Sequence, residues 1–155
     1  MAQKNVEIRH SDAQSPQSVM LFSAAYEAIQ SLYPNTQKAA FSMEPLRAVG
    51  VKILLAFCDD SPAGCCAVFE QKGYSELKRL FVFPEMRGFG IAEGLLEEVE
   101  AVARGSHSKK IMLESGTQLL AAHRLYLRLG YERRAAFDGH EDLPESLFFE
   151  KRLDP

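Results

Sequence analysis

Short apolar runs alternate with polar turns along the chain and predict a series of β-strands. The expected strands cover residues 5–10, 51–58, 64–70, 76–83, 109–114, 131–137 and 146–152. Val6 and Ile8 share one face of the first run, which is typical of an edge strand. The second and third runs are joined by residues 59–63, a turn-rich segment short enough to make them antiparallel neighbours. The pattern therefore predicts a sheet that contains a hairpin and a meander.

Apolar positions at helical spacing predict helices between several of these strands. Ser15 at the N-cap and Pro16 at the first helical position would begin the first helix. Gly105 and Gly130 would end the two helices that follow the central strands. The expected helices cover residues 16–33, 42–50, 91–105 and 119–129.

The order of these elements predicts an α/β fold. A helix separates the expected strands at 76–83 and 109–114, and a crossover of this kind joins parallel neighbours. We therefore expect a mixed sheet with helices on both faces, in one domain over residues 1–155.

Residues 81–94, with the sequence FVFPEMRGFGIAEG, join an apolar strand to a helix through glycines. A helix start has about four backbone N–H groups without partners and carries a partial positive charge, so an anion can bind there. The same glycines would also suit a tight turn with close helix packing. This turn does not match a dinucleotide-binding fingerprint, because Glu93 stands where that fingerprint has its third glycine. The chain also lacks the Gly-Lys-Ser/Thr sequence of an NTPase phosphate loop. We expect a phosphate group at this turn.

Composition narrows the kind of partner. The 155 residues are 46% apolar and 25% charged, and the formal net charge of -3 argues against a general nucleic-acid binder. Three cysteines form neither a disulfide framework nor a zinc pattern, and Cys65 and Cys66 are expected in the core. The sequence shows no signal peptide and no apolar run of membrane length. We expect a cytoplasmic protein that binds a small molecule.

Several motifs in order carry a resemblance to a known family. They are ELKRLFV at 76–82, PEMRGFGIA at 84–92, LESG at 113–116, AHRLY at 122–126 and GY at 130–131. Over roughly residues 51–152 the chain resembles the GNAT superfamily of acyl-CoA-dependent N-acyltransferases. The resemblance implies a mixed, mostly antiparallel sheet with helices on both faces and a parallel, splayed central strand pair.

The resemblance also implies acetyl-CoA as a cosubstrate. The family's turn wraps the pyrophosphate of coenzyme A, and the splayed strand pairs with the pantetheine arm through its exposed backbone. The positions that match are Leu80, Phe81, Val82, Arg87, Gly88, Phe89, Gly90, Ile91 and Ala92. Glu85 departs from the family, because an acidic side chain stands where the motif has Arg or Gln, and a carboxylate repels a phosphate.

Two catalytic residues follow from the resemblance and from the chemistry. Tyr126 matches the tyrosine that protonates the departing thiolate, although its spacing alone suits a core aromatic. The attacking amine must also lose a proton, and Glu76 is the first candidate for the base, with Glu70 and Glu114 behind it. No metal site is expected, because the histidines lack ligand spacing, and His123 is expected to face solvent.

The predicted function is therefore transfer of an acetyl group from acetyl-CoA to a primary amine, by direct attack in a ternary complex. One alternative is a non-catalytic CoA-binding module, and another is a purely structural α/β domain. The acceptor would be a small-molecule or peptide amine, with no nucleic acid or membrane involved and a monomer or homodimer as the assembly. Four carboxylates within residues 138–145 would attract a cationic amine, unless this segment is an ordinary solvated loop.

Overall fold

One mixed sheet of seven strands organises the computed structural model, which describes residues 4–34 and 40–154. The strand order is β1-β2-β3-β4-β5-β7-β6. The strands are β1 (Val6–Ser11), β2 (Val51–Cys58), β3 (Ser61–Glu70), β4 (Ser75–Val82), β5 (Lys110–Gly116), β6 (Glu132–Arg134) and β7 (Ser146–Arg152). The helices are α1 (Pro16–Leu32), α2 (Ile91–Gly105) and α3 (Leu120–Arg128).

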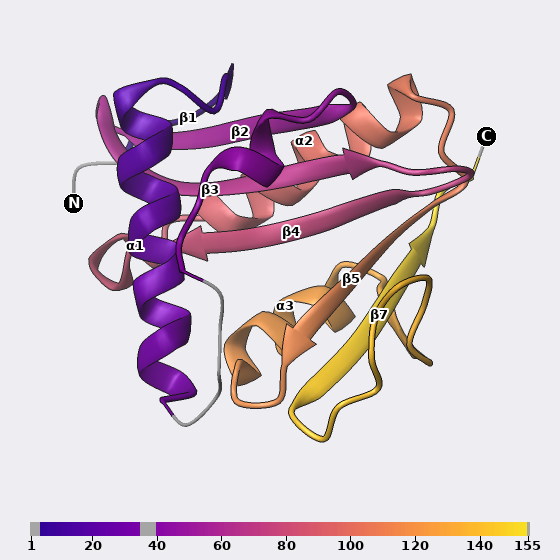
Figure 1. The fold of residues 1–155 in the computed structure, drawn as a ribbon. Coiled ribbons are helices and arrows are strands. Elements are labelled where there is room, and N and C mark those ends of the chain that lie inside the picture. The colour runs from indigo at the N-terminus through magenta and orange to yellow at the C-terminus, as the bar shows by residue number, and fades with distance from the viewer. Residues whose placement is uncertain (1–3, 35–39, 155) are drawn as a thin grey trace.

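Strands β4 and β5 pair in parallel, whereas the other neighbouring strands of the described sheet are antiparallel. Their register covers only the three pairs from Ser75 with Ile111 to Leu77 with Leu113. Beyond these pairs the two strands diverge, and Figure 1 shows the wedge that opens between them. The predicted mostly antiparallel sheet with a parallel, splayed central pair is confirmed.

A bulge interrupts β4 just after it leaves β5. The register against β3 shifts between Lys78, opposite Ala67, and Phe81, opposite Cys65, so two residues of β4 face one residue of β3. Arg79 lies in this bulge with a φ of 61°. This left-handed conformation costs a non-glycine residue about 1–2 kcal/mol, so the surrounding sheet must hold it in place.

The predicted hairpin of β2 and β3 is confirmed, with a tighter connection than expected. Asp59 and Asp60 have φ values of 50° and 68°, as in a two-residue type I′ turn. Strand β3 therefore begins at Ser61 and not at Gly64. Aspartate suits this turn because its side chain reaches nearby backbone, and Asp59 Oδ1 accepts from the N–H of Asn5 at 3.0 Å.

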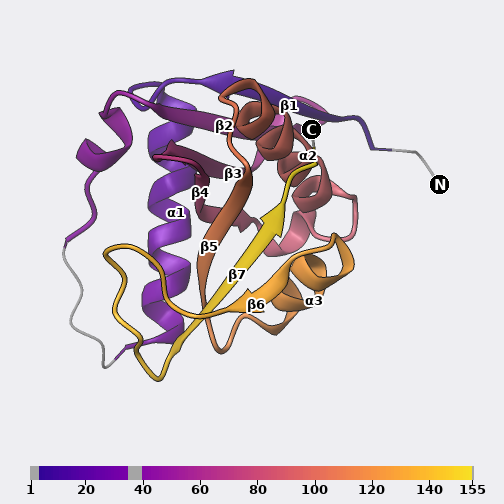
Figure 2. The same cartoon turned by 90° about the vertical axis from the view of Figure 1, so that its right-hand side faces the viewer.

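Helix α1 covers one face of the sheet, and α2 and α3 cover the other (Figures 1 and 2). Helix α1 begins as predicted, because Ser15 Oγ accepts from the N–H of Ser18 and Pro16 occupies the first turn. The core under α1 includes Leu21, Phe22, Ile53, Leu55, Phe57 and Cys65. The core under α2 and α3 includes Leu54, Leu77, Leu95, Val99, Leu113 and Phe149. No helix in the described ranges is long and apolar enough to cross a membrane.

Two predicted elements are shorter than expected. The helix expected at 42–50 is a single 3-10 turn at Glu44–Arg47, although Leu46 is buried as predicted. The strand expected at 131–137 is reduced to β6 because the chain leaves the sheet after Arg134. Phe137 then packs edge-on against Tyr74, with ring centroids 5.9 Å apart, in a small cluster on the α1 side of β5 and β7.

The expectation that His123 faces solvent is wrong. The side chain of His123 is buried, with its ring centroid 5.5 Å from that of Phe149. Its Nε2 lies 2.8 Å from the carbonyl oxygen of Gly116, at the end of β5. Burial lowers the pKa of His123, the charge of Arg133 lowers it further, and the bond to Gly116 acts in the opposite direction. The imidazole therefore favours its neutral form in the folded protein.

This burial predicts how stability depends on pH. Because the pKa of His123 is lowered from 6.5, the unfolded chain binds more protons as the pH falls below that value, and His123 then stabilises the fold less. We expect His123→Gln to lower the free energy of unfolding by roughly 1–3 kcal/mol at pH 7.5, and by less at pH 5.5. Urea unfolding of both proteins at the two pH values measures the difference, and a deficit that grows at pH 5.5 would contradict the prediction.

Candidate active site

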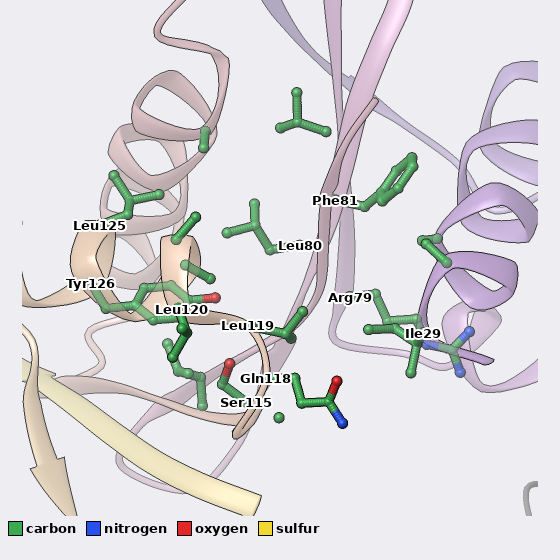
Figure 3. Close-up of a pocket in the computed structure, with 18 of the residues that line it drawn as sticks. Ile29, Arg79, Leu80, Phe81, Ser115, Gln118, Leu119, Leu120, Leu125 and Tyr126 are labelled. Atoms are coloured by element: carbon green, nitrogen blue, oxygen red, sulfur yellow. The ribbon is translucent and has the colours of Figure 1, made fainter. Parts of the chain in front are cut away.

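A cleft of about 1170 Å³ opens where β4 and β5 separate. Residues of α1, β4, the start of α2, the end of β5, α3 and the segment before β7 line it. In Figure 3, Arg79, Phe81 and Ile29 lie on the α1 side, and Leu125 and Tyr126 lie on the α3 side. The cleft exceeds the roughly 300–1,000 Å³ of an ordinary ligand pocket, so it has room for two substrates.

The glycine turn forms one end of this cleft. Gly88 and Gly90 have φ values of 88° and 78°, and a Cβ on Gly88 would meet no atom within 4 Å. The first backbone bond of α2 runs from the N–H of Gly94 to the carbonyl of Gly90. Among the described residues, no acceptor pairs with the backbone N–H groups of residues 88–93. The turn therefore presents a row of unsatisfied donors at a helix start, which fits a phosphate group.

The side chains at this turn differ in their placement. Gly88, Gly90, Ile91, Ala92 and Arg87 line the cleft. The Nε of Arg87 lies 3.4 Å from the carbonyl of Val82, which holds the side chain near the end of β4. Glu85 is exposed and does not line the cleft in the described structure. Phe89 is 44% exposed and also lies outside the lining, so it offers the site its backbone and not its ring.

The end of β4 offers an unpaired backbone edge to the cleft. The N–H of Phe83 donates to the carbonyl of Ala63 in β3. In an antiparallel pair, every second residue of a strand bonds to the neighbouring strand, and the residues between them point the other way. The amide of Val82 therefore points away from β3, toward the side where β5 has diverged. Leu80, Phe81 and Val82 all line the cleft. This edge is suited to an extended ligand that carries amide groups.

Tyr126 lies on α3 with its side chain only 5% exposed, and its ring packs 5.5 Å from that of Phe149. Figure 3 shows its hydroxyl pointing into the cleft. Burial raises the pKa of Tyr126, and the neighbouring Cys66 thiol raises it further. The phenol therefore keeps its proton at neutral pH and is a donor in the cleft.

Ser115, on β5, is a second buried hydroxyl in this cleft. Its side chain is largely buried, and its Oγ has no hydrogen-bond partner among the described residues. No signal in the sequence pointed to Ser115, because a serine in a strand is usually an ordinary structural residue. An unsatisfied buried hydroxyl inside a cleft is placed to bond a water or a ligand.

Glu76 lies away from the cleft in a buried polar network. Its side chain is 3% exposed, and its Oε2 lies 2.7 Å from Nε2 of His140. The other imidazole nitrogen of His140 lies 3.0 Å from Oε1 of Glu114, and Ser146 donates to the second oxygen of Glu114 at 2.6 Å. The imidazole of His140 therefore lies between two carboxylates, with one ring nitrogen toward each. Glu114 and Ser146 line the cleft, whereas Glu76 and His140 do not in the described structure.

The remaining candidates are more distant. Glu70 is exposed at the end of β3 and lies outside the described lining. In the acidic segment 138–145, Glu141 and Asp142 are exposed away from the cleft, but Leu143 and Glu145 line it. Cys65 and Cys66 are buried as predicted, and burial raises the pKa of both thiols. No group of three or more His, Cys, Asp or Glu in the described ranges is placed to hold a metal ion.

Comparison with known proteins identifies the family. Residues 20–131 match the model of the acetyltransferase (GNAT) family. The chain is 30% identical to an IAA acetyltransferase from Azospirillum brasilense over 151 residues, which cover 96% of this chain and 99% of the relative.

Solved structures agree with this match. A Klebsiella pneumoniae protein of the acyl-CoA N-acyltransferase class is similar at a TM-score of 0.80 and 30% identity, covering 96% of this chain and 98% of the other. The PaiA N-acetyltransferase of Thermoplasma acidophilum, solved with coenzyme A, has the same fold at a TM-score of 0.71 and 18% identity, covering 96% and 99%. The chain therefore belongs to the GNAT family and is an N-acetyltransferase that uses acetyl-CoA as its cosubstrate.

Proposed function

We propose that the chain holds acetyl-CoA and a primary amine together in the cleft between β4 and β5 and transfers the acetyl group directly between them. The acceptor is a small-molecule or peptide amine. The observation that carries the proposal is the continuity of one cleft from the glycine turn, past the Tyr126 hydroxyl, to the face covered by α1. Holding the two reactants in one site can supply about 7–11 kcal/mol of the barrier lowering.

The cosubstrate lies along the α2 and α3 side of the wedge. Its pyrophosphate binds the free N–H groups of residues 88–92 and the guanidinium of Arg87, which the open space at Gly88 supports. Its pantetheine arm pairs with the backbone of Leu80 to Val82, as an added strand would. This arrangement brings the thioester to the side chain of Tyr126.

The chemistry needs one acid and one base. The amine nitrogen attacks the thioester carbonyl, a C–N bond forms and the C–S bond breaks. Tyr126 gives its proton to the departing thiolate, because its buried phenol stays protonated until charge develops on sulfur. The amine gives up one proton to a carboxylate, so the amide and the thiol leave neutral.

Glu114 is the carboxylate that we assign as this base. It lines the cleft at the point of divergence, and Ser146 and His140 hold its two oxygens. Glu76, the first candidate from the sequence, binds the other side of His140 and acts through it as a positioning residue. The imidazole between the two carboxylates provides a route for the proton to leave Glu114.

The alternative of a CoA-binding module without turnover is not favoured, since the relatives of this chain are acetyltransferases. A purely structural domain would not account for the unpaired donors at the glycine turn. We retain a cytoplasmic location and a monomer or homodimer as proposals, and the three reduced cysteines support the location. Thiol release from acetyl-CoA with a panel of amines tests the activity, and no release with any amine would contradict it.

Acetyl-CoA at about 100 times its Kd should raise the unfolding temperature by about 5–10 °C, because it binds only the folded state. Gly90→Val should abolish this shift, since the branched side chain crowds the helix start where φ is 78°. The matched control is Gly73→Val, where φ is 88° and a Cβ meets open space on a turn outside the described cleft lining. This control should lower the melting temperature and keep the shift. If Gly90→Val kept the shift, the prediction that a phosphate binds at this turn would be contradicted.

Removal of the Tyr126 hydroxyl should slow the chemical step without weakening cofactor binding. We expect Tyr126→Phe to lower kcat about 100-fold and to keep the thermal shift with acetyl-CoA. Tyr131→Phe is the control, because its ring lies 5.5 Å from that of Tyr126 and its buried hydroxyl has no partner in the described structure. The kcat of Tyr131→Phe should match that of the wild type. An unchanged kcat in Tyr126→Phe would mean that Tyr126 only packs in the core and has no catalytic role.

The base assignment predicts different effects for two isosteric substitutions. Glu114→Gln should lower kcat about 100-fold at pH 7. The activity of this variant should recover as the pH rises, because more of the free amine is then already deprotonated. Glu76→Gln removes a charge whose ion pairs in the described structure are with His140 and Lys78, outside the cleft lining, so its effect should be smaller. Steady-state pH profiles of both variants provide the measurement. A larger loss in Glu76→Gln would transfer the base role to Glu76.

A further inference from the structure

Arg79, which has no ion-pair partner among the described residues, lies on the wall of the cleft. Arg79 lines the cleft from the β4 bulge, and Figure 3 shows its guanidinium beside Ile29 of α1, on the opposite side of β4 from Leu125 and Tyr126. Within residues 4–34 and 40–154, no carboxylate forms an ion pair with it and no acceptor bonds it. By contrast, Arg128 of the same lining pairs with Glu93 at 3.0 Å.

Arg79 combines an unpaired charge with a strained backbone. The residue is exposed to solvent, and it lies on the wall of the cleft without an ion pair among the described residues. Partial burial lowers its pKa, and the nearby Cys65 thiol acts in the opposite direction. The backbone of Arg79 is also held in the left-handed region, at a φ of 61°. Strain and an unpaired charge at one position are typical of a residue that is arranged to bind a ligand.

Carboxylates lie on the other wall of the same part of the cleft. Arg79 comes two residues after the last β4 position that pairs with β5, and Glu114 comes directly after the last paired residue of β5. Glu145, in the segment before β7, lines the cleft as well. The acceptor side therefore offers a cation on the β4 wall and anions on the β5 and β7 wall, which matches a molecule with both charges.

The surface between these charges is apolar. Ile29 of α1 and Phe81 of β4 lie on the same side as Arg79 in Figure 3, and Ala25 and Tyr26 of α1 also line the cleft. A compact ligand whose two charged groups reach opposite walls would leave its remaining part against this surface. Apolar groups gain about 25 cal/mol for each Å² that they remove from water, so the surface favours an apolar substituent.

We propose that the acceptor is a free α-amino acid with an apolar side chain, whose carboxylate binds the guanidinium of Arg79 while its amine faces Glu114. The proposal rests on the proposed acetyl transfer and names the class of amine. Arginine forms two parallel bonds to a carboxylate, which fixes the amine relative to the thioester as well as binding the substrate. An amine without a neighbouring carboxylate would leave Arg79 without this pairing.

Matched acceptors test this without any substitution. Leucine, methionine and phenylalanine are compared with their primary amides by thiol release from acetyl-CoA. The amides keep the amine and the side chain but lose the negative charge, and their amines are less basic, so simple nucleophile availability favours the amides. We expect kcat/KM to be about 10- to 100-fold higher for the acids.

Arg79→Gln should remove this preference by raising KM for the acids about 10- to 100-fold, with the amides nearly unchanged. Arg79→Lys should restore part of the preference, since it keeps the charge without the two-bond geometry. Lys52→Gln is the control, because it removes one exposed positive charge outside the described cleft lining and should leave the preference intact. The thermal shift with acetyl-CoA in each variant reports that the cofactor side still folds and binds.

The outcomes separate this inference from the proposed function. Turnover of amides and acids at equal kcat/KM in wild type would overturn the amino-acid assignment and leave acetyl transfer in place. A preference for acids that survives in Arg79→Gln would overturn the role of Arg79. No thiol release with any acid, amide or simple amine would overturn both the inference and the activity on which it rests.

Discussion

The short pairing of β4 with β5 is the constraint on which the rest of the site depends. Backbone groups in a sheet normally bond on both sides, and β4 loses its β5 partner after Leu77. The open edge, the cleft and the access of Tyr126 to both faces all follow from that loss. The sheet can tolerate it because one core under α2 and α3 joins both halves, with Leu77 of β4 and Leu113 of β5 in the same buried cluster.

Charge is distributed over the wedge in a way that fits its two substrates. Backbone donors and Arg87 lie at the glycine turn, where we propose that the cosubstrate's phosphates bind. The carboxylates and Arg79 lie elsewhere on the cleft wall, where we propose that the amine binds. Glu114 connects this part of the cleft to a partly buried histidine and a second carboxylate, so the proposed route for the proton draws on three strands and one loop. In this proposal, cosubstrate binding and proton transfer use separate groups.

Local chemistry in the sequence predicted much of the fold, whereas long-range contacts set much of the site. Ser15 with Pro16 and the glycine turn were readable because their effects are local. The network of Glu76, His140 and Glu114 was not, since Glu76 and His140 are 64 positions apart and only the fold brings them together. His123 was misplaced because helical periodicity did not reveal that Phe149 would cover it. The bulge at Arg79 was missed because it contains no glycine.

That bulge gives the strand two independent functions. In the proposed complex the backbone of Leu80 to Val82 serves the cosubstrate, which a residue of any type can do, while Arg79 presents its side chain to the acceptor. Under this proposal, replacing Arg79 alters what is acetylated without altering how the acetyl donor is held. A gene duplicate of such an enzyme can acquire a new acceptor through one codon and retain its donor, so the extra residue in β4 makes this scaffold easy to diversify.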